Sequence, residues 1–308
     1  MKKGTLGLAL APVLAAWAAV GIYGASVYGH DYYTFRGFPP PRTPKGIPAG
    51  KLVRESFFSP ALRHERSYLI YLPAGYSAAT AAGRRYPVFY FLHGSPGWAS
   101  LVFNAANIGV DFDVLLHRHR IRPFLMVMPD GGDGTFSSDT EWADTRDGRY
   151  DTFVMNVVHA VDRRWPTIRK RRDRLIAGNS EGAYAALNLS LRHIRKFGLA
   201  ESWSGYVHPE LKAKPFKDEP LALVEANDPS LYLQRVAREV RKLGLRAYIY
   251  TGTKDHSEPQ VAAYARELRA AGGRVTFKIF RGGHDWRVWR EHARQMLIWA
   301  SHAFGRKP

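Results

Sequence analysis

The most constraining feature of this chain of 308 residues is a strand, turn and helix pattern near its middle. Residues 175–177 form a short apolar run typical of a buried strand, and residues 183–187 are helix-favouring. Ser180 lies between them, flanked by Gly178 and Gly182 in a G-x-S-x-G pattern. Glycines allow strand and helix to approach closely, so the turn would project the Ser180 hydroxyl above the sheet edge, near N–H groups of the helix N-terminus. The alternative is a coincidental pattern in which Ser180 only caps a helix.

Short apolar runs alternate with amphipathic stretches along most of the chain. An antiparallel hairpin is expected first, followed by buried strands that alternate with helices. The expected strands are 52–58, 67–72, 87–92, 124–128, 175–177, 199–204, 246–250 and 275–280, and the main helices are 112–119, 151–165, 183–195, 231–243, 261–271 and 286–304. Such alternation predicts an α/β domain with a mostly parallel central sheet and helices on both faces.

Composition excludes several classes of protein. Hydrophobic residues make up 45% of the chain and charged residues 23%, which is enough for a sizeable core. The absence of cysteine excludes disulfides, thiolate catalysis and thiolate metal sites. The net charge of +18 suggests a polyanionic partner such as anionic lipid, or it only keeps the chain soluble. No nucleic-acid motif is present, so we expect no nucleic-acid partner.

The N-terminus has the pattern of a membrane segment. Lys2 and Lys3 precede a run from Gly4 to Gly29 without any charged residue, and about 20 mostly apolar residues suffice to span a bilayer. We therefore expect residues 1–30 to form a transmembrane anchor, with a cleaved signal sequence as the alternative. In both cases the rest of the chain would lie outside the cytoplasm.

A proline-rich linker is expected next. Five prolines fall between Gly37 and Pro48, which disfavours both helix and strand. The sequence thus divides into the N-terminal segment, a linker over 31–50 and a folded domain over 51–308. It indicates no oligomeric state.

Three polar residues follow predicted strands in the order Ser180, Asp255, His284. Sites in parallel sheets form at the carboxyl ends of strands, and this order is that of an α/β-hydrolase triad. His284 would accept the serine proton, and Asp255 would hold the imidazole tautomer. Glu258 and Asp228 are alternatives to Asp255.

An acyl-transfer site also needs donors for the oxyanion. The backbone N–H of Glu181, directly after the nucleophile, is the first candidate. The loop after the strand 87–92 would supply the second, and because Pro96 lacks an N–H we choose Ser95.

Several segments together resemble the putative-esterase branch of the α/β-hydrolases, which includes esterase D, feruloyl esterases, enterochelin esterases and mycolyltransferases. The segments are Tyr90–Gly94 (YFLHG), Met128–Gly132 (MPDGG), Ala177–Gly182 (AGNSEG), Trp203–Gly205 (WSG) and Gly282–Arg290 (GGHDWRVWR). The resemblance implies an α/β-hydrolase fold, Ser180 as nucleophile, His284 as base, Asp255 as acid, and Glu181 and Ser95 as backbone oxyanion donors.

The chain departs from this family directly after the nucleophile. Members commonly have Met followed by Gly-Gly, whereas this chain has Glu181-Gly182-Ala183. The amide survives the change, but the Glu181 carboxylate would lie close to the site. It would either disfavour anionic acyl groups or pair with an arginine, so the substrate is not carried over from the family.

We therefore predict an extracytoplasmic serine esterase that acts on a small-molecule, lipid or glycan ester without a cofactor. The alternatives are an acyltransferase that passes the acyl group to a sugar or lipid hydroxyl, and a silent envelope-binding module. Asp130, Asp133 and Asp139 lack the spacing of a calcium loop, so no metal site is expected.

Overall fold

The computed structural model describes residues 5–132, 139–209 and 215–305, with side chains described from residue 17 onward. Its main sheet has eight strands in the order β1-β2-β4-β3-β7-β8-β9-β10. β1 and β2 pair antiparallel, β2 also pairs antiparallel with β4, and the remaining pairs are parallel. These strands are β1 (Lys51–Ser59), β2 (His64–Leu72), β3 (Val88–Leu92), β4 (Leu125–Pro129), β7 (Arg174–Asn179), β8 (Leu199–Trp203), β9 (Arg246–Gly252) and β10 (Arg274–Phe280).

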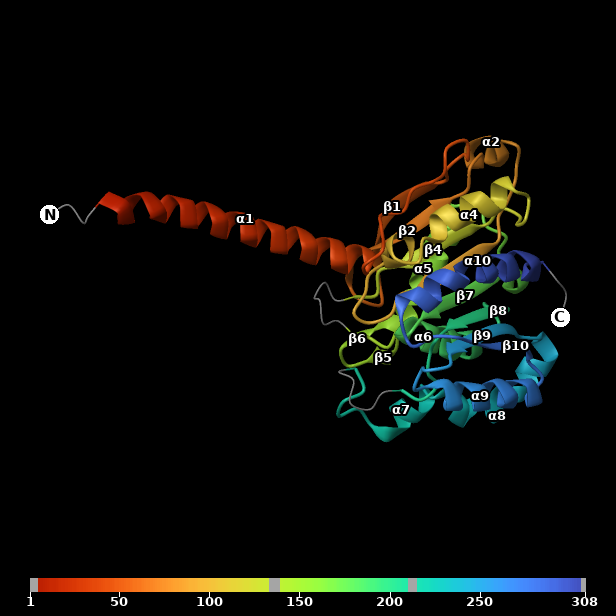
Figure 1. Cartoon of the computed structure of the whole chain (residues 1–308). Coiled ribbons are helices and arrows are strands. Elements are labelled where there is room, and N and C mark those ends of the chain that lie inside the picture. The colour runs from red at the N-terminus through yellow and green to blue at the C-terminus, as the bar shows by residue number, and fades with distance from the viewer. Residues whose placement is uncertain (1–4, 133–138, 210–214, 306–308) are drawn as a thin grey trace.

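Helices cover both faces of this sheet, as Figure 1 shows. One face packs against α5 (Tyr150–Arg164), α6 (Glu181–Arg192), α8 (Pro229–Leu243) and α9 (Glu258–Ala270). The other face packs against α3 (Leu101–Asn104), α4 (Ile108–His117) and α10 (Trp286–Ala303). The central strands β3, β4, β7 and β8 are buried along their whole length, and their residues are mostly apolar, with buried polar exceptions such as Arg174 and Glu201. The predicted α/β architecture is confirmed.

Some short elements lie outside the prediction. They are the helices α2 (Tyr76–Ala81) and α7 (Leu221–Ala226) and a small hairpin of β5 (Asp144–Thr145) and β6 (Gly148–Arg149). These pieces of two to six residues are too short to produce a periodic hydrophobic pattern.

The N-terminal helix α1 (Thr5–Phe35) extends away from the sheet as a long rod (Figure 1). It runs past the expected end near residue 30 and through His30 and Asp31. Among the residues that the structure describes, no helix is long and apolar enough to cross a membrane. The predicted membrane-spanning helix is therefore not found there.

The proline-rich segment after α1 forms neither helix nor strand, but it is more than a spacer. The Arg36 guanidinium donates a hydrogen bond to the Pro96 carbonyl at 3.0 Å. The Phe38 ring lies 4.7 Å from the guanidinium of Arg290 on α10. The segment thus contacts the loop after β3 and the start of α10, two parts of the fold that border the site described below.

Candidate active site

Ser180 occupies a strained turn between β7 and α6. Its backbone has φ 55° and ψ −124°, a conformation that L-residues avoid and that costs about 1–3 kcal/mol. The flanking glycines make the turn sterically feasible: a Cβ at Gly178 would lie 2.3 Å from the Gly182 backbone, and one at Gly182 would lie 2.1 Å from the Leu92 carbonyl oxygen. The G-x-S-x-G pattern is therefore a packing requirement at this turn. Ser180 stands at the N-cap position of α6, but its side chain makes no capping hydrogen bond.

His284 reaches Ser180 from the loop between β10 and α10. Its Nε2 lies 2.8 Å from the Ser180 Oγ, and its Nδ1 lies 2.9 Å from Asp255 Oδ2. The Trp289 ring stands edge-on to the imidazole at 5.3 Å between ring centres. With the Nδ1 proton donated to Asp255, Nε2 is the acceptor for the serine hydroxyl proton.

Asp255 follows β9 and is buried, with 4% of its surface exposed. Its Oδ1 accepts hydrogen bonds from the Ser257 Oγ at 2.7 Å and the Ser257 N–H at 3.1 Å. Burial alone would raise the pKa of Asp255, but the hydrogen bonds from His284 and Ser257 outweigh it and lower the pKa to about 2. The group therefore stays a carboxylate that can stabilise an imidazolium.

The two alternatives to Asp255 have other roles. Asp228 caps the N-terminus of α8 and pairs with His208 at 2.7 Å. Glu258 begins α9 and donates its backbone N–H to the Asp255 carbonyl at 3.0 Å. Of the three acids, only Asp255 is hydrogen-bonded to His284 in the part of the chain that the structure describes.

Two segments expected to supply backbone donors lie beside Ser180. Glu181 is the first residue of α6, where N–H groups have no partner within the helix. The loop after β3 lies against the turn, because a Cβ at Gly94 would come within 2.9 Å of the Ser180 Cβ. The next residue, Ser95, is joined to Pro96 by a cis peptide bond. The structure thus brings both expected oxyanion-donor segments next to Ser180.

The Glu181 side chain is buried, with 3% of its surface exposed. Its Oε1 accepts hydrogen bonds from the Thr140 N–H at 3.2 Å and the Thr140 hydroxyl at 3.4 Å. Burial, together with the charges of Asp139 and Glu141, raises the pKa of Glu181 well above its ordinary value. An arginine partner, one of the two alternatives considered for this side chain, is not found among the described residues. Glu181 Oε1 is held by Thr140 of the neighbouring loop instead.

Further residues that sequence reasoning missed support this geometry. The buried His93 accepts a hydrogen bond at Nε2 from the Gly131 N–H at 3.1 Å, and its carbonyl accepts one from Trp142 Nε1 at 3.1 Å. These bonds tie the start of the loop after β3 to the loop after β4. The hydrogen bonds from Ser257 to Asp255 also support the geometry. The Asp-x-Ser spacing could have predicted them, because Asp side chains commonly accept a hydrogen bond from the backbone N–H two residues on.

The aspartates after β4 do not gather at a site in the described structure. The Asp130 carbonyl accepts a hydrogen bond from Arg66, and Asp139 Oδ1 accepts one from the Glu141 N–H at 3.4 Å. The third, Asp133, lies outside the described residues.

Comparison with known proteins agrees with this arrangement. The sequence profile of the family described as "Putative esterase" matches residues 59–300. An endo-1,4-beta-xylanase/feruloyl esterase of Xylanibacter ruminicola is 23% identical over 86% of this chain. The chain spans only about a third of that protein's length (32%).

Solved structures share the fold at low identity. A ferulic acid esterase superposes with a TM-score of 0.73 at 23% identity, covering 83% of this chain and all of that one. The S-formylglutathione hydrolase FrmB of Staphylococcus aureus gives a TM-score of 0.66 at 17% identity, covering 82% of this chain and 99% of its own. The likeness shows that the chain has an α/β-hydrolase fold.

Proposed function

Because the chain belongs to the esterase family of the α/β-hydrolases and is therefore a hydrolase, we propose that it hydrolyses carboxylic esters through an acyl-enzyme formed on Ser180. The observation that carries the proposal is the hydrogen-bonded series from Ser180 Oγ to His284 Nε2 at 2.8 Å and from His284 Nδ1 to Asp255 at 2.9 Å. A serine hydroxyl needs such a base to become a nucleophile at neutral pH.

The proposed reaction follows from this geometry. His284 takes the Ser180 proton as Oγ bonds to the ester carbonyl carbon, and the carbonyl oxygen becomes an oxyanion facing the Glu181 and Ser95 amides. His284 then gives the proton to the departing alcohol oxygen as the ester C–O bond breaks. A water molecule, activated by the same imidazole, attacks the acyl-enzyme and releases the acid.

Substrate and location are separate matters. The names of the relatives, feruloyl esterase and S-formylglutathione hydrolase, make methyl ferulate and S-formylglutathione the first substrates to compare with 4-nitrophenyl acetate. Acyl transfer to a sugar or lipid hydroxyl stays a prediction, as does a location outside the cytoplasm.

The test is hydrolysis of these esters by Ser180→Ala, with Ser190→Ala as the matched control. Ser190 lies on the same helix, and its hydroxyl donates to the Leu187 carbonyl at 2.8 Å. We expect S180A to lose at least about 10³-fold in kcat and S190A to keep its activity. Full activity of S180A would overturn the proposal.

A further inference from the structure

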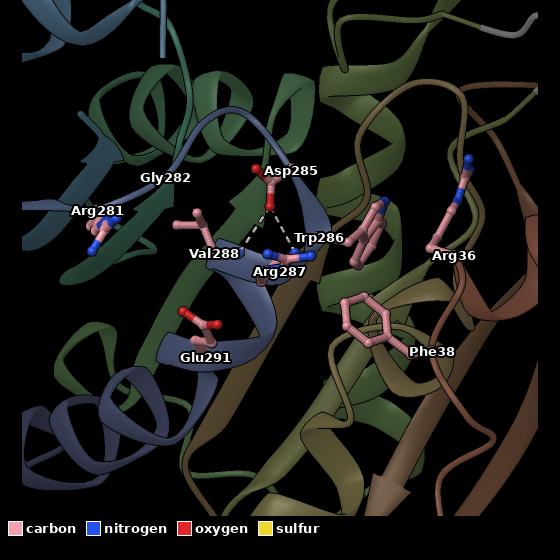
Figure 2. Close-up of a pocket in the computed structure, with 9 residues that line it drawn as sticks. All are labelled: Arg36, Phe38, Arg281, Gly282, Asp285, Trp286, Arg287, Val288 and Glu291. Atoms are coloured by element: carbon pink, nitrogen blue, oxygen red, sulfur yellow. Dashed lines mark hydrogen bonds between the residues drawn. The ribbon is translucent and has the colours of Figure 1, made fainter. Parts of the chain in front are cut away.

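A basic groove of about 670 Å³ lies at the rim of the candidate site. One wall is the segment directly after α1, and the other is the segment that joins β10 to α10 together with the first turns of α10. Figure 2 shows the lining residues, which are Arg36, Phe38, Arg281, Gly282, Asp285, Trp286, Arg287, Val288 and Glu291.

The groove borders the two loops on which the proposed chemistry depends. His284 lies within the lining segment, directly before Asp285. On the opposite wall, Arg36 donates to the carbonyl of Pro96, the residue after the proposed oxyanion donor Ser95. A molecule seated in the groove would therefore contact the segment that carries the proposed base. Across from that segment it would contact Arg36, which is hydrogen-bonded to the loop of the proposed oxyanion donor.

Three arginines and two acids line the groove, so its lining carries an excess of one positive charge. Asp285 Oδ1 accepts hydrogen bonds from the backbone N–H groups of Arg287 at 2.9 Å and Val288 at 3.1 Å, so this carboxylate caps α10 (Figure 2). The guanidinium groups of Arg281 and Arg287 are exposed and make no hydrogen bond or ion pair with any residue that the structure describes. Glu291 is the other acid of the lining.

Positive charge and apolar walls continue beyond the groove. A second cavity of about 450 Å³ shares Phe38, Arg287 and Glu291 with it. It adds Arg290, Arg294 and Asp111, and Arg294 is paired with Asp111 at 2.7 Å. Trp286 and Phe38 supply aromatic surface between the arginines. Planar guanidinium groups beside aromatic rings suit a ligand with a carboxylate or phosphate group next to a ring.

We propose that this groove binds an anionic group, a carboxylate or a phosphate, on the alcohol half of the ester. The inference rests on the proposed esterase function. The alcohol half is assigned because His284 returns its proton to the leaving alcohol oxygen, and the groove is built on the loop that carries His284. Arg281 and Arg287 are the residues that would select such substrates.

Paired esters with one acyl group test this assignment in the full-length chain. The carboxylate arm compares 4-acetoxybenzoate with its neutral methyl ester, and the phosphate arm compares 4-acetoxyphenyl phosphate with its neutral dimethyl ester. The readout is the ratio of kcat/KM for the anionic ester to that for the neutral one. A ratio cancels any general loss of activity in a variant.

We expect Arg281→Gln/Arg287→Gln to lower this ratio at least about tenfold relative to the parent chain, in one arm or both. The arm with the larger change identifies carboxylate or phosphate as the preferred group. The matched control is Arg235→Gln/Arg238→Gln, which removes two exposed arginines from α8 and should leave the ratio unchanged. Added salt should reduce the preference of the parent chain.

The outcomes separate this inference from the function beneath it. Hydrolysis of all four esters with the same ratio in the parent chain and in R281Q/R287Q would overturn the groove assignment and leave the esterase intact. No hydrolysis of any ester would overturn the proposed function. In that case, calorimetric binding of 4-hydroxybenzoate tests the groove without turnover. Binding that is lost in R281Q/R287Q would support an anion site in the groove. Equal binding by R281Q/R287Q and the parent chain would overturn it.

Discussion

Asp255 and Asp228 have almost the same local structure at two different places in the fold. Each accepts a side-chain and a backbone hydrogen bond at Oδ1 from the serine two residues on: 2.7 and 3.1 Å from Ser257, and 2.6 and 3.0 Å from Ser230. Each also meets a histidine Nδ1 at Oδ2, at 2.9 Å for Asp255 and 2.7 Å for Asp228.

The two groups differ in what the histidine faces on its other side. His284 Nε2 points to the Ser180 Oγ at 2.8 Å. The side chain of His208 is 55% exposed, and no described residue is hydrogen-bonded to its Nε2. An Asp-x-Ser turn with a histidine is therefore a structural unit that caps a loop or helix. It becomes a candidate catalytic unit only where the fold places a serine hydroxyl within hydrogen-bond distance of the histidine Nε2, as it does at His284.

The largest expected effect separates the two aspartates directly. Asp255→Asn should lower kcat about 10³- to 10⁴-fold, because an amide can donate to Nδ1 and favour the wrong imidazole tautomer. Asp228→Asn is the matched control and should keep kcat within about twofold. Steady-state kinetics on 4-nitrophenyl acetate measures both. Similar losses in the two variants would remove the distinction drawn here.

A smaller effect is expected from the supporting serines. Ser257→Ala removes one of the hydrogen bonds that keep the Asp255 carboxylate ionised and oriented, and it should lower kcat roughly tenfold. Ser230→Ala removes the corresponding bond at Asp228 and should leave kcat unchanged. Equal kcat values for S257A and the parent chain would show that Asp255 needs no such support.

Glu181 provides a contrast to Asp255. Its surroundings raise the pKa of Glu181, whereas the hydrogen bonds around Asp255 lower the pKa of that group. Above the ordinary pKa of 4.5 the unfolded chain releases the Glu181 proton while the folded chain keeps it. Unfolding therefore releases a proton, and rising pH destabilises the fold. In urea unfolding, the free energy of unfolding of Glu181→Gln should exceed the parent's by a margin that grows as the pH rises above 4.5 toward the raised pKa. A margin that shrinks with pH would show that the acid is ionised in the fold.

Much of the fold and of the candidate site could be predicted from the sequence, because hydrophobic periodicity and steric constraints depend on residues that are close together in the chain. The buried strands, the glycines around Ser180 and the strand-end positions of Asp255 and His284 follow from residue patterns. The sequence also favours Asp255 over Asp228, because Asp255 follows a predicted strand, whereas the contact of its carboxylate with His284 could be seen only in the structure. The docking of Arg36 on the loop of Pro96 joins residues 60 positions apart, and the pairing of Glu181 with Thr140 joins the start of α6 to a loop. Such contacts leave no periodic pattern to detect.

The central claim is that Ser180 is a nucleophile activated by His284. Reaction of the full-length chain with a fluorophosphonate probe, followed by peptide mass mapping, tests it most directly. The account predicts labelling at Ser180 that is lost in His284→Ala and retained in His208→Ala. A chain that circular dichroism shows to be folded but that takes up no label at Ser180 would contradict it.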